Sequence, residues 1–429
     1  MDRQRRKFLQ QASVLSAGAG FLPFLPESTS AVFQELSKAA STIPANKLAL
    51  DEGFWYQVRQ QYQVSPQYIN LENGYYSLLS NEVLQAQYDN LRLVNQQASY
   101  YFRKKMYADR AQVKKMLCAY AGVASEELAL VRNTTEAMNI LIMGLPMQAG
   151  DEFLYTNQDY FSMKEAIEYR AKRFGIVAKK MDWPLHTMSD NEIIAAYEKA
   201  ITPKTKVLLL THLINVTGQI LPVREIANRA RAKGVEVICD VAQSFAQVLY
   251  TLPDLGCAYI GASLHKWLGA PLGTGFLYVQ KDKIAQVQPL IGVNSYKAED
   301  IRKFEYWGTH PAHSDLSIAA AIRFQQSIGR DKIEARLRYL RNYWRSKVEK
   351  MPKVNVLTPL EEQRSAAITT ISVPNIPAPE LEKKLFEDYR IYISSIDYQG
   401  IKGNRVTPHI YTNLPELDAF VDALRALSA

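Results

Sequence analysis

The chemistry of this chain centres on Lys266, which follows an apolar run at residues 257–262. Removing water from a lysine disfavours its charged form, lowers its pKa and makes the amine a nucleophile toward an aldehyde. Ser263 and His265 stand beside it and could bind a phosphate, and a glycine-bracketed loop leads into a second apolar run at residues 273–279. A solvated charge at a strand end is the alternative reading of this lysine.

A carboxylate closes the apolar run before that one. Residues 235–240 read as a buried strand that ends in Asp240, and a charge in such a place needs a partner. A protonated pyridine nitrogen would be one, because it makes a pyridoxal ring an electron sink. The chain between Asp240 and Lys266 is long enough for one helix and one strand, so we expect both at the carboxyl edge of one parallel sheet. A helix N-cap is the other reading of Asp240.

Two further stretches carry groups that bind anions. Thr134 and Thr135 follow an apolar strand remnant and begin a helix, which places free N–H groups and the positive end of a helix dipole where a phosphate could sit. A plain helix cap is the alternative. Arg405 offers the planar fork that grips a carboxylate with two hydrogen bonds. Its alternative is a surface arginine paired with a nearby carboxylate.

In this order along the chain, these blocks resemble the class V aminotransferases, which are fold-type I enzymes dependent on pyridoxal phosphate (PLP). The resemblance extends over nearly all of the chain after the first 31 residues. Within the family, the chain is most similar to the branch of isopenicillin N epimerase-like proteins and periplasmic PLP enzymes of siderophore maturation. Cysteine desulfurases and selenocysteine lyases are more distant.

The resemblance implies a role for each reactive group. Lys266 forms a Schiff base with PLP and, once displaced by a substrate amine, serves as general base at the substrate Cα. Asp240 keeps the ring nitrogen protonated. Arg405 binds the α-carboxylate of an amino-acid substrate and so fixes Cα over the ring.

The same resemblance implies which residues contact the cofactor. They are Thr134, Thr135, Ser263 and His265 at the phosphate, Tyr160 on the ring face, with Phe161 as the alternative if the register slips by one, and Asn215 with Gln243 at the ring 3′ oxygen. In relatives, a threonine at the position of Thr309 reaches the phosphate of the neighbouring subunit. We therefore expect a homodimer with composite active sites.

The reaction class stays open at this point. We favour transamination of an amino acid or of an amino group carried by a peptide; epimerisation and C–S or β-elimination on the same scaffold are the alternatives. Desulfurases that form a persulfide use a cysteine shortly before the carboxylate-binding arginine, and residues 394–403 contain none. A PLP-fold binding module without catalysis is the reading from another class, and the presence of Lys266, Asp240 and Arg405 together argues against it.

The first 31 residues look like a twin-arginine export signal. Arg5 and Arg6 precede a modestly apolar stretch at residues 12–25, and small residues follow near Ser30. This stretch is shorter than the roughly 20 residues of a membrane-spanning helix. We expect a periplasmic protein with no membrane attachment after the signal is removed.

The remaining pattern predicts an α/β fold. Strands and helices alternate over residues 71–291, which indicates a large PLP domain with a mostly parallel, seven-stranded type of sheet flanked by helices. Residues 292–429 form a smaller α+β domain, and residues 32–70 pack with it.

The basic residues of the small domain have a simple explanation. The chain has a net charge of +8, and much of it lies at residues 329–353, where apolar residues recur at helical spacing. This pattern is typical of an amphipathic helix with a solvated basic face. We expect a small-molecule substrate and no nucleic acid as partner.

Overall fold

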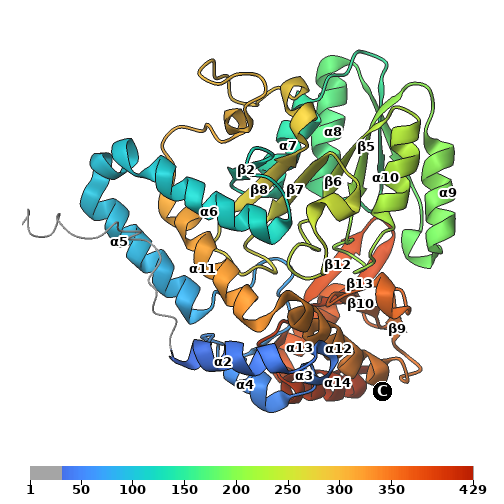
Figure 1. Cartoon of the computed structure of the whole chain (residues 1–429). Helices are drawn as coiled ribbons and strands as arrows, with labels where there is room; N and C mark the ends of the chain where they lie inside the picture. Colours follow the sequence, from blue (N-terminus) through green and yellow to red (C-terminus); the bar gives the residue numbers. More distant parts are fainter. Residues whose placement is uncertain (1–30, 429) are drawn as a thin grey trace, which may run out of the picture.

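A seven-stranded sheet forms the centre of the molecule (Figure 1), in a computed structural model that describes residues 31–428. The strand order is β2-β8-β7-β6-β5-β3-β4. Only β8 runs antiparallel to its neighbours, and the other four strand pairs are parallel. The strands are β2 (Leu128–Val131), β3 (Glu152–Thr156), β4 (Val177–Met181), β5 (Thr205–Thr211), β6 (Glu236–Asp240), β7 (Tyr259–Ser263) and β8 (Gly275–Val279). The predicted mostly parallel sheet is confirmed.

Both faces of this sheet are covered, which explains the apolar runs of the sequence. Along β5, Leu208 and Leu210 belong to one buried core, whereas Val207 and Leu209 belong to the other. Strands buried on both faces read as continuous apolar runs because neither face meets water. The flanking helices are α7 (Thr134–Gly144) and α8 (Phe161–Phe174) on one face, and α9 (Asp190–Ala200) and α10 (Val223–Ala232) on the other.

Long helices from the N-terminal third pack beside this sheet. Two of them, α5 (Asn81–Lys104) and α6 (Met106–Ala121), contact α11 (Ala312–Ile328). The shorter helices before them reach the C-terminal part of the chain, because α2 contacts α11 and α3 contacts α12. Their bounds are α2 (Ala31–Thr42), α3 (Ala45–Leu48), α4 (Glu52–Arg59) and α12 (Arg330–Val348).

The C-terminal part has a core of its own, built on a four-stranded antiparallel sheet in the order β12-β13-β10-β9. A separate two-stranded pair joins β1 to β11 in parallel, with Ile69 opposite Ile391. The strands and remaining helices are β1 (Ile69–Asn70), β9 (Asn355–Val356), β10 (Thr369–Ser372), β11 (Ile391–Tyr392), β12 (Ser394–Tyr398), β13 (Ile401–Val406), α13 (Ala378–Tyr389) and α14 (Leu414–Ser428).

The α-helix predicted between Asp240 and Lys266 is absent. The segment between β6 and β7 holds no α-helix; it consists of tight turns and a 3₁₀ helix at Leu252–Leu255. Ala246 adopts a left-handed φ of 65°, which an α-helix does not allow, and Pro253 with Gly256 confines the later turn. The parallel pairing of β6 with β7 nevertheless brings the two strand ends together as expected.

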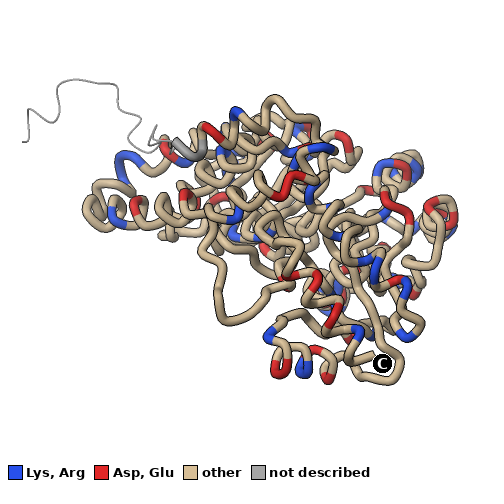
Figure 2. The backbone as a smooth tube through the Cα atoms, turned by 90° about the horizontal axis from the view of Figure 1, so that it is seen from below, with Lys and Arg blue, Asp and Glu red and all other residues tan. Residues whose placement is uncertain are grey.

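The predicted long helix is present as α12, but its basic face is only partly solvated. Arg336, Arg341 and Arg345 are buried. Arg341 donates to the carbonyl of Ser365 at 2.6 Å, and Arg336 pairs with Glu52. The expectation of a solvated face was wrong for these residues because carbonyls and carboxylates of distant segments cover them. Acidic and basic residues are interspersed along the backbone (Figure 2).

The predicted signal, residues 1–31, lies outside the described residues except for its last position. Among the helices of residues 31–428, none combines the length and the apolar character needed to cross a membrane. The division of the chain at residues 70 and 291 stays a prediction.

Candidate active site

A cleft of about 600 Å³ lies at the carboxyl edge of the large sheet. Asp240 is the last residue of β6, and Lys266 lies in the turn that follows β7. The structure therefore brings the predicted lysine and carboxylate to one site. The predicted residues that line this cleft are Thr134, Thr135, Tyr160, Asn215, Asp240, Gln243, Ser263, His265, Lys266 and Arg405.

Lys266 is held in a largely dehydrated position. Burial lowers the pKa of its amine to about 8; the charge of Asp240 opposes this shift, and the charge of Arg405 adds to it. The backbone of the turn is fixed because the Ser77 hydroxyl donates to the Lys266 carbonyl. An amine with this pKa has a far larger unprotonated fraction near neutral pH than an ordinary lysine, and the unprotonated form is the one that acts as nucleophile or base.

Within residues 31–428, the buried carboxylate of Asp240 accepts a single hydrogen bond. The Ala242 N–H donates to its Oδ1 at 2.8 Å. Burial raises the pKa of the Asp240 carboxyl, whereas this hydrogen bond and the charge of Lys266 lower it. A carboxylate in such a place is stabilised by a cationic partner.

A candidate anion cradle, formed by Ser263, Thr134 and Thr135, lies where β7 meets the start of α7. Ser263 Oγ accepts a hydrogen bond from the Thr134 N–H at 2.9 Å and lies 2.8 Å from Thr134 Oγ1. Thr135, next in the first turn of the helix, is exposed. Backbone N–H groups at a helix start attract anions. A Cβ added to Gly275 would stand 2.6 Å from the Ala262 carbonyl oxygen, so only glycine fits beside the cradle.

Two buried polar atoms at the cleft have no hydrogen-bond partner within residues 31–428. They are Nδ1 of His265 and Oδ1 of Asn215. Burial lowers the pKa of His265 to about 4, so its ring is neutral at physiological pH. Buried polar atoms are almost always paired in folded proteins, and these two therefore mark where a bound group would complete the structure.

Gln243 and Tyr160 are positioned by different means. Gln243 is fixed at both ends of its amide: Nε2 donates to the Gly74 carbonyl and Oε1 accepts from Trp267 Nε1, both at 2.9 Å. Tyr160 is the residue before α8, and the centroid of its ring lies 4.6 Å from the ring centroid of Phe161. Both aromatic rings line the cleft, so the choice between them as the stacking residue stays a prediction.

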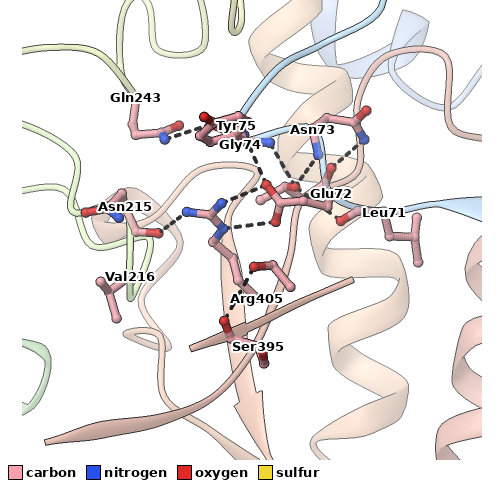
Figure 3. Close-up of polar contacts among 12 residues, drawn as sticks. Leu71, Glu72, Asn73, Gly74, Tyr75, Asn215, Val216, Gln243, Ser395 and Arg405 are labelled. Carbon is pink, nitrogen blue, oxygen red and sulfur yellow. Dashed lines mark hydrogen bonds and ion pairs between the residues drawn. The ribbon is translucent and has the colours of Figure 1, made fainter. Parts of the chain in front are cut away.

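Arg405 is part of a buried ion pair that the sequence did not reveal. Its Nη2 and Nε donate to the two carboxylate oxygens of Glu72, at 2.7 and 3.1 Å, and its Nη1 donates to the Asn215 carbonyl at 3.0 Å (Figure 3). Arg405 lies within β13. The strand just before Glu72, β1, has only two residues, so no periodic pattern marked this glutamate. The signal available was an acidic residue before an Asn-Gly turn.

The loop that carries Glu72 forms hydrogen bonds with Thr407 and with Gln243. Thr407 Oγ1 accepts from the Asn73 N–H at 2.6 Å and from the Gly74 N–H at 3.1 Å. Gly74 in turn accepts from Gln243, as Figure 3 shows. The loop thereby joins β13 to the segment that follows Asp240.

The hairpin of β12 and β13 forms one wall of the cleft, through residues 395–398. Gln399 and Gly400 both have positive φ and make its tight turn. The free cysteines Cys118, Cys239 and Cys257 are buried and do not line the cleft. No group of metal-binding side chains occurs within the described residues.

Thr309 is the predicted residue that the cleft does not contain. It lines a separate cavity of about 740 Å³ together with Tyr107 and Trp307, bordered by α5 and α6. Its role toward a neighbouring subunit stays a prediction.

Curated proteins and solved structures resemble this chain over most of its length. Isopenicillin N epimerase of Amycolatopsis lactamdurans is 28% identical over 334 residues, which cover 73% of this chain and 84% of that protein. A probable cysteine desulfurase of Halalkalibacterium halodurans is 29% identical over 267 residues, which cover 59% of this chain and 64% of that protein.

The fold is shared with solved structures. A mutant of the cystine C–S lyase C-DES, with glycine covalently linked to its PLP cofactor, matches with a TM-score of 0.78 at 22% identity and covers 86% of this chain and 98% of that one. The chain therefore has the α/β fold of fold-type I enzymes. The family model of class-V aminotransferases matches residues 76–416, and the chain belongs to this family.

Proposed function

We propose that this protein is a PLP-dependent enzyme that acts on the amino group of an amino acid or of a peptide, with Lys266 as the attachment point of the cofactor. The observation that carries the proposal is the desolvated Lys266 amine in one cleft with the buried carboxylate of Asp240. When bound, PLP supplies an aldehyde that condenses with amines and a ring that withdraws electrons from the adjacent carbon.

The residues of the cleft fit this cofactor. The start of α7 with Ser263, Thr134 and Thr135 would hold its phosphate, together with the unpaired Nδ1 of His265. Asp240 would pair with the protonated ring nitrogen and so gain the cationic partner that its burial requires.

The ring would be held by three more side chains. Tyr160 would cover one face, and the amides of Asn215 and Gln243 would lie near the 3′ oxygen. Gln243 is kept rigid by its two hydrogen bonds, which favours a positioning role.

Lys266 has a second task in this proposal. An amine with a pKa of about 8 can accept the proton of the substrate Cα near neutral pH and return it. Arg405 would hold the α-carboxylate of the substrate with the N–H groups that it does not donate to Glu72 or Asn215, which fixes Cα within reach of the lysine.

Transamination is the reaction that we propose, with epimerisation and C–S elimination as alternatives. These alternatives are favoured by the relatives, which are named as an epimerase, a probable cysteine desulfurase and a C–S lyase. A persulfide on a cysteine of this segment has no support, because residues 394–403, of which 395–398 line the cleft, contain no cysteine.

The proposal extends to the assembly and the compartment. The twin-arginine pattern of the first residues supports export to the periplasm. Thr309, which lies away from the cleft of its own chain, supports a homodimer in which each subunit completes the phosphate site of the other.

The test is an absorbance spectrum of the purified protein loaded with PLP. We expect a visible band that Lys266→Ala abolishes. Conversion of this band to near-ultraviolet absorption by one amino acid indicates transamination, whereas turnover that restores the resting spectrum indicates epimerisation or elimination. A protein that takes up no PLP contradicts the enzyme proposal.

A further inference from the structure

The hairpin of β12 and β13 reaches from the C-terminal part of the chain to the segment before α8. Tyr398 ends β12, and its hydroxyl donates to the backbone carbonyl of Asp159 at 2.9 Å. The ammonium group of Lys164 lies over the same tyrosine, 4.2 Å from the centroid of its ring. One side chain of the cleft wall is thus joined to the segment that carries Tyr160.

Lys164 holds the Tyr398 ring in place. The lysine side chain is buried, and its Nζ donates to the Asn157 carbonyl at 2.9 Å. A cation is attracted to the face of an aromatic ring, and more strongly where water is excluded. The ring of Tyr398 is therefore kept where its hydroxyl meets the Asp159 carbonyl.

The carbonyl that Tyr398 binds belongs to the peptide bond that leads into Tyr160. Just before this bond, the Asp159 carboxylate accepts from the Thr156 N–H at 2.7 Å and from the Thr211 hydroxyl at 2.6 Å. Just after it, the Tyr160 carbonyl accepts from two N–H groups in the first turn of α8, at 3.0 and 3.3 Å. The backbone is thus held on both sides of Tyr160, and the hydroxyl of Tyr398 fixes the peptide plane between them.

The same hairpin carries Arg405. This arginine lies in β13, opposite Ser394 of β12, in the strand pair whose other end holds Tyr398. The hairpin therefore extends from the residue proposed to hold the substrate to the segment with the residue proposed to cover the cofactor ring. Supports of this kind matter for catalysis, because a misplacement of about 1 Å can cost roughly 100-fold in rate.

We propose that Tyr398 is a positioning residue for the cofactor, and that through the Asp159 carbonyl it keeps the Tyr160 ring against the pyridine face of PLP. This inference rests on the proposed function, because it concerns the residue that would cover the PLP ring. It gives the cleft wall a part in holding the cofactor, and it selects Tyr160 rather than Phe161 as the stacking residue.

The experiment titrates the cofactor-free protein with PLP and follows tryptophan fluorescence. Tyr398→Phe keeps the ring beneath Lys164 and removes only the hydroxyl. We expect the dissociation constant of PLP to rise by about threefold to tenfold, as the loss of one hydrogen bond allows. The circular dichroism of the visible cofactor band, per unit of absorbance, should change as well, because it depends on the asymmetric surroundings of the PLP ring.

A second tyrosine with the same two contacts provides the control. The hydroxyl of Tyr343 donates to Asp418 at 2.9 Å, and Nζ of Lys347 lies 3.6 Å from its ring centroid, away from the residues that line the cleft. Tyr343→Phe should leave the PLP dissociation constant and the dichroism unchanged. Urea unfolding of both cofactor-free variants separates a change at the cleft from a weakened fold.

Tyr160→Ala makes the test specific to the proposed route. Effects of residues that act on each other are not additive, so Tyr398→Phe should change the PLP dissociation constant little once Tyr160 is alanine. Lys164→Met, which removes the cation over the Tyr398 ring, should behave in the same way and decides the matter if Tyr398→Phe fails to fold.

The outcomes separate this inference from the proposed function. An unchanged PLP dissociation constant in Tyr398→Phe, or an equal effect of this change with and without the Tyr160 ring, overturns the positioning role and leaves the enzyme proposal standing. A wild-type protein that takes up no PLP overturns the enzyme proposal and this inference with it.

Discussion

The pKa of the Lys266 amine is set by two opposing influences. Burial lowers the pKa of the amine to about 8, and the nearby carboxylate of Asp240 raises it. In the unfolded chain the same amine has its ordinary pKa of about 10.4. Between these two values the unfolded state binds more protons than the folded state, so this lysine makes the fold more stable as the pH rises from about 8 to about 10.

Lys266→Met in the cofactor-free protein tests this linkage. The variant removes a buried charge, so we expect it to be more stable than the wild type at pH 7 by roughly 1–3 kcal/mol. The difference should shrink as the pH approaches 10. Urea unfolding of both proteins at several pH values measures it, and a difference that does not change with pH would contradict the depressed pKa.

The partner carboxylate gives a second expectation. Asp240→Asn removes the charge that raises the pKa of Lys266, so the amine of the cofactor-free protein should deprotonate at a lower pH than in the wild type. The rate at which an amine-specific reagent labels Lys266, followed against pH, reports this directly. A midpoint that stays in place or moves upward would sink the idea that the two groups interact.

The sequence predicted the reactive residues but not the ion pair beside them. Lys266 and Asp240 each end an apolar run, a local pattern that can be read without a structure. Glu72 and Arg405 are separated by 333 positions, so neither carries a local sign of the other. The alternative reading of Arg405, a surface arginine paired with a carboxylate, is right about the carboxylate and wrong about the surface, because Arg405 is buried with Glu72.

At the scale of elements, the site depends on the contact between β8 and the start of α7. Gly275 lies opposite Ser263 in the sheet. A Cβ on this glycine would approach the Asn133 Cα to 2.7 Å, and Asn133 caps α7 through the N–H of Glu136. The close approach of a strand to a helix start therefore sets the position of the anion cradle.

Gly275→Ala should disturb both the fold and the cradle. We expect a loss of about 1–3 kcal/mol in the free energy of unfolding, because overpacking forces the backbone to move, and a weaker affinity for PLP. Gly292→Ala is the control, since a Cβ there meets nothing within 4 Å. Unfolding and PLP titration of both variants decide the point, and equal behaviour of the two would refute it.

Element types were predictable where apolar periodicity is strong, as in β5, β6 and α12. The turns after Asp240 were not, because the left-handed Ala246 leaves no mark in composition. The burial of Arg336 and Arg341 was also hidden, since their partners are Glu52 and the carbonyl of Ser365. Helical periodicity shows which apolar residues face inward, whereas the burial of a charged side chain depends on partners in segments distant in sequence.

At the scale of the whole molecule, the proposed homodimer makes a strict prediction about Thr309. Thr309→Ala should weaken PLP binding, and so should Lys266→Ala. In a mixed dimer of these two variants, one composite site contains both Lys266 and Thr309. Tight PLP binding should therefore return to one of the two sites of each mixed dimer, which is a quarter of all sites when equal amounts of the two variants exchange subunits at random, as measured by titration of the visible band. No recovery would place Thr309 in its own subunit or in no site at all.

The pairing of β1 with β11 bears on how the protein is made. Residue 69 has its strand partner at residue 391, and Arg405 follows later still. During synthesis, the segment at residue 69 cannot form this pair until residue 391 has been made. The cleft is thus completed only after residue 405 has been added, and capture of a cofactor there would report that these late segments have folded onto the early ones.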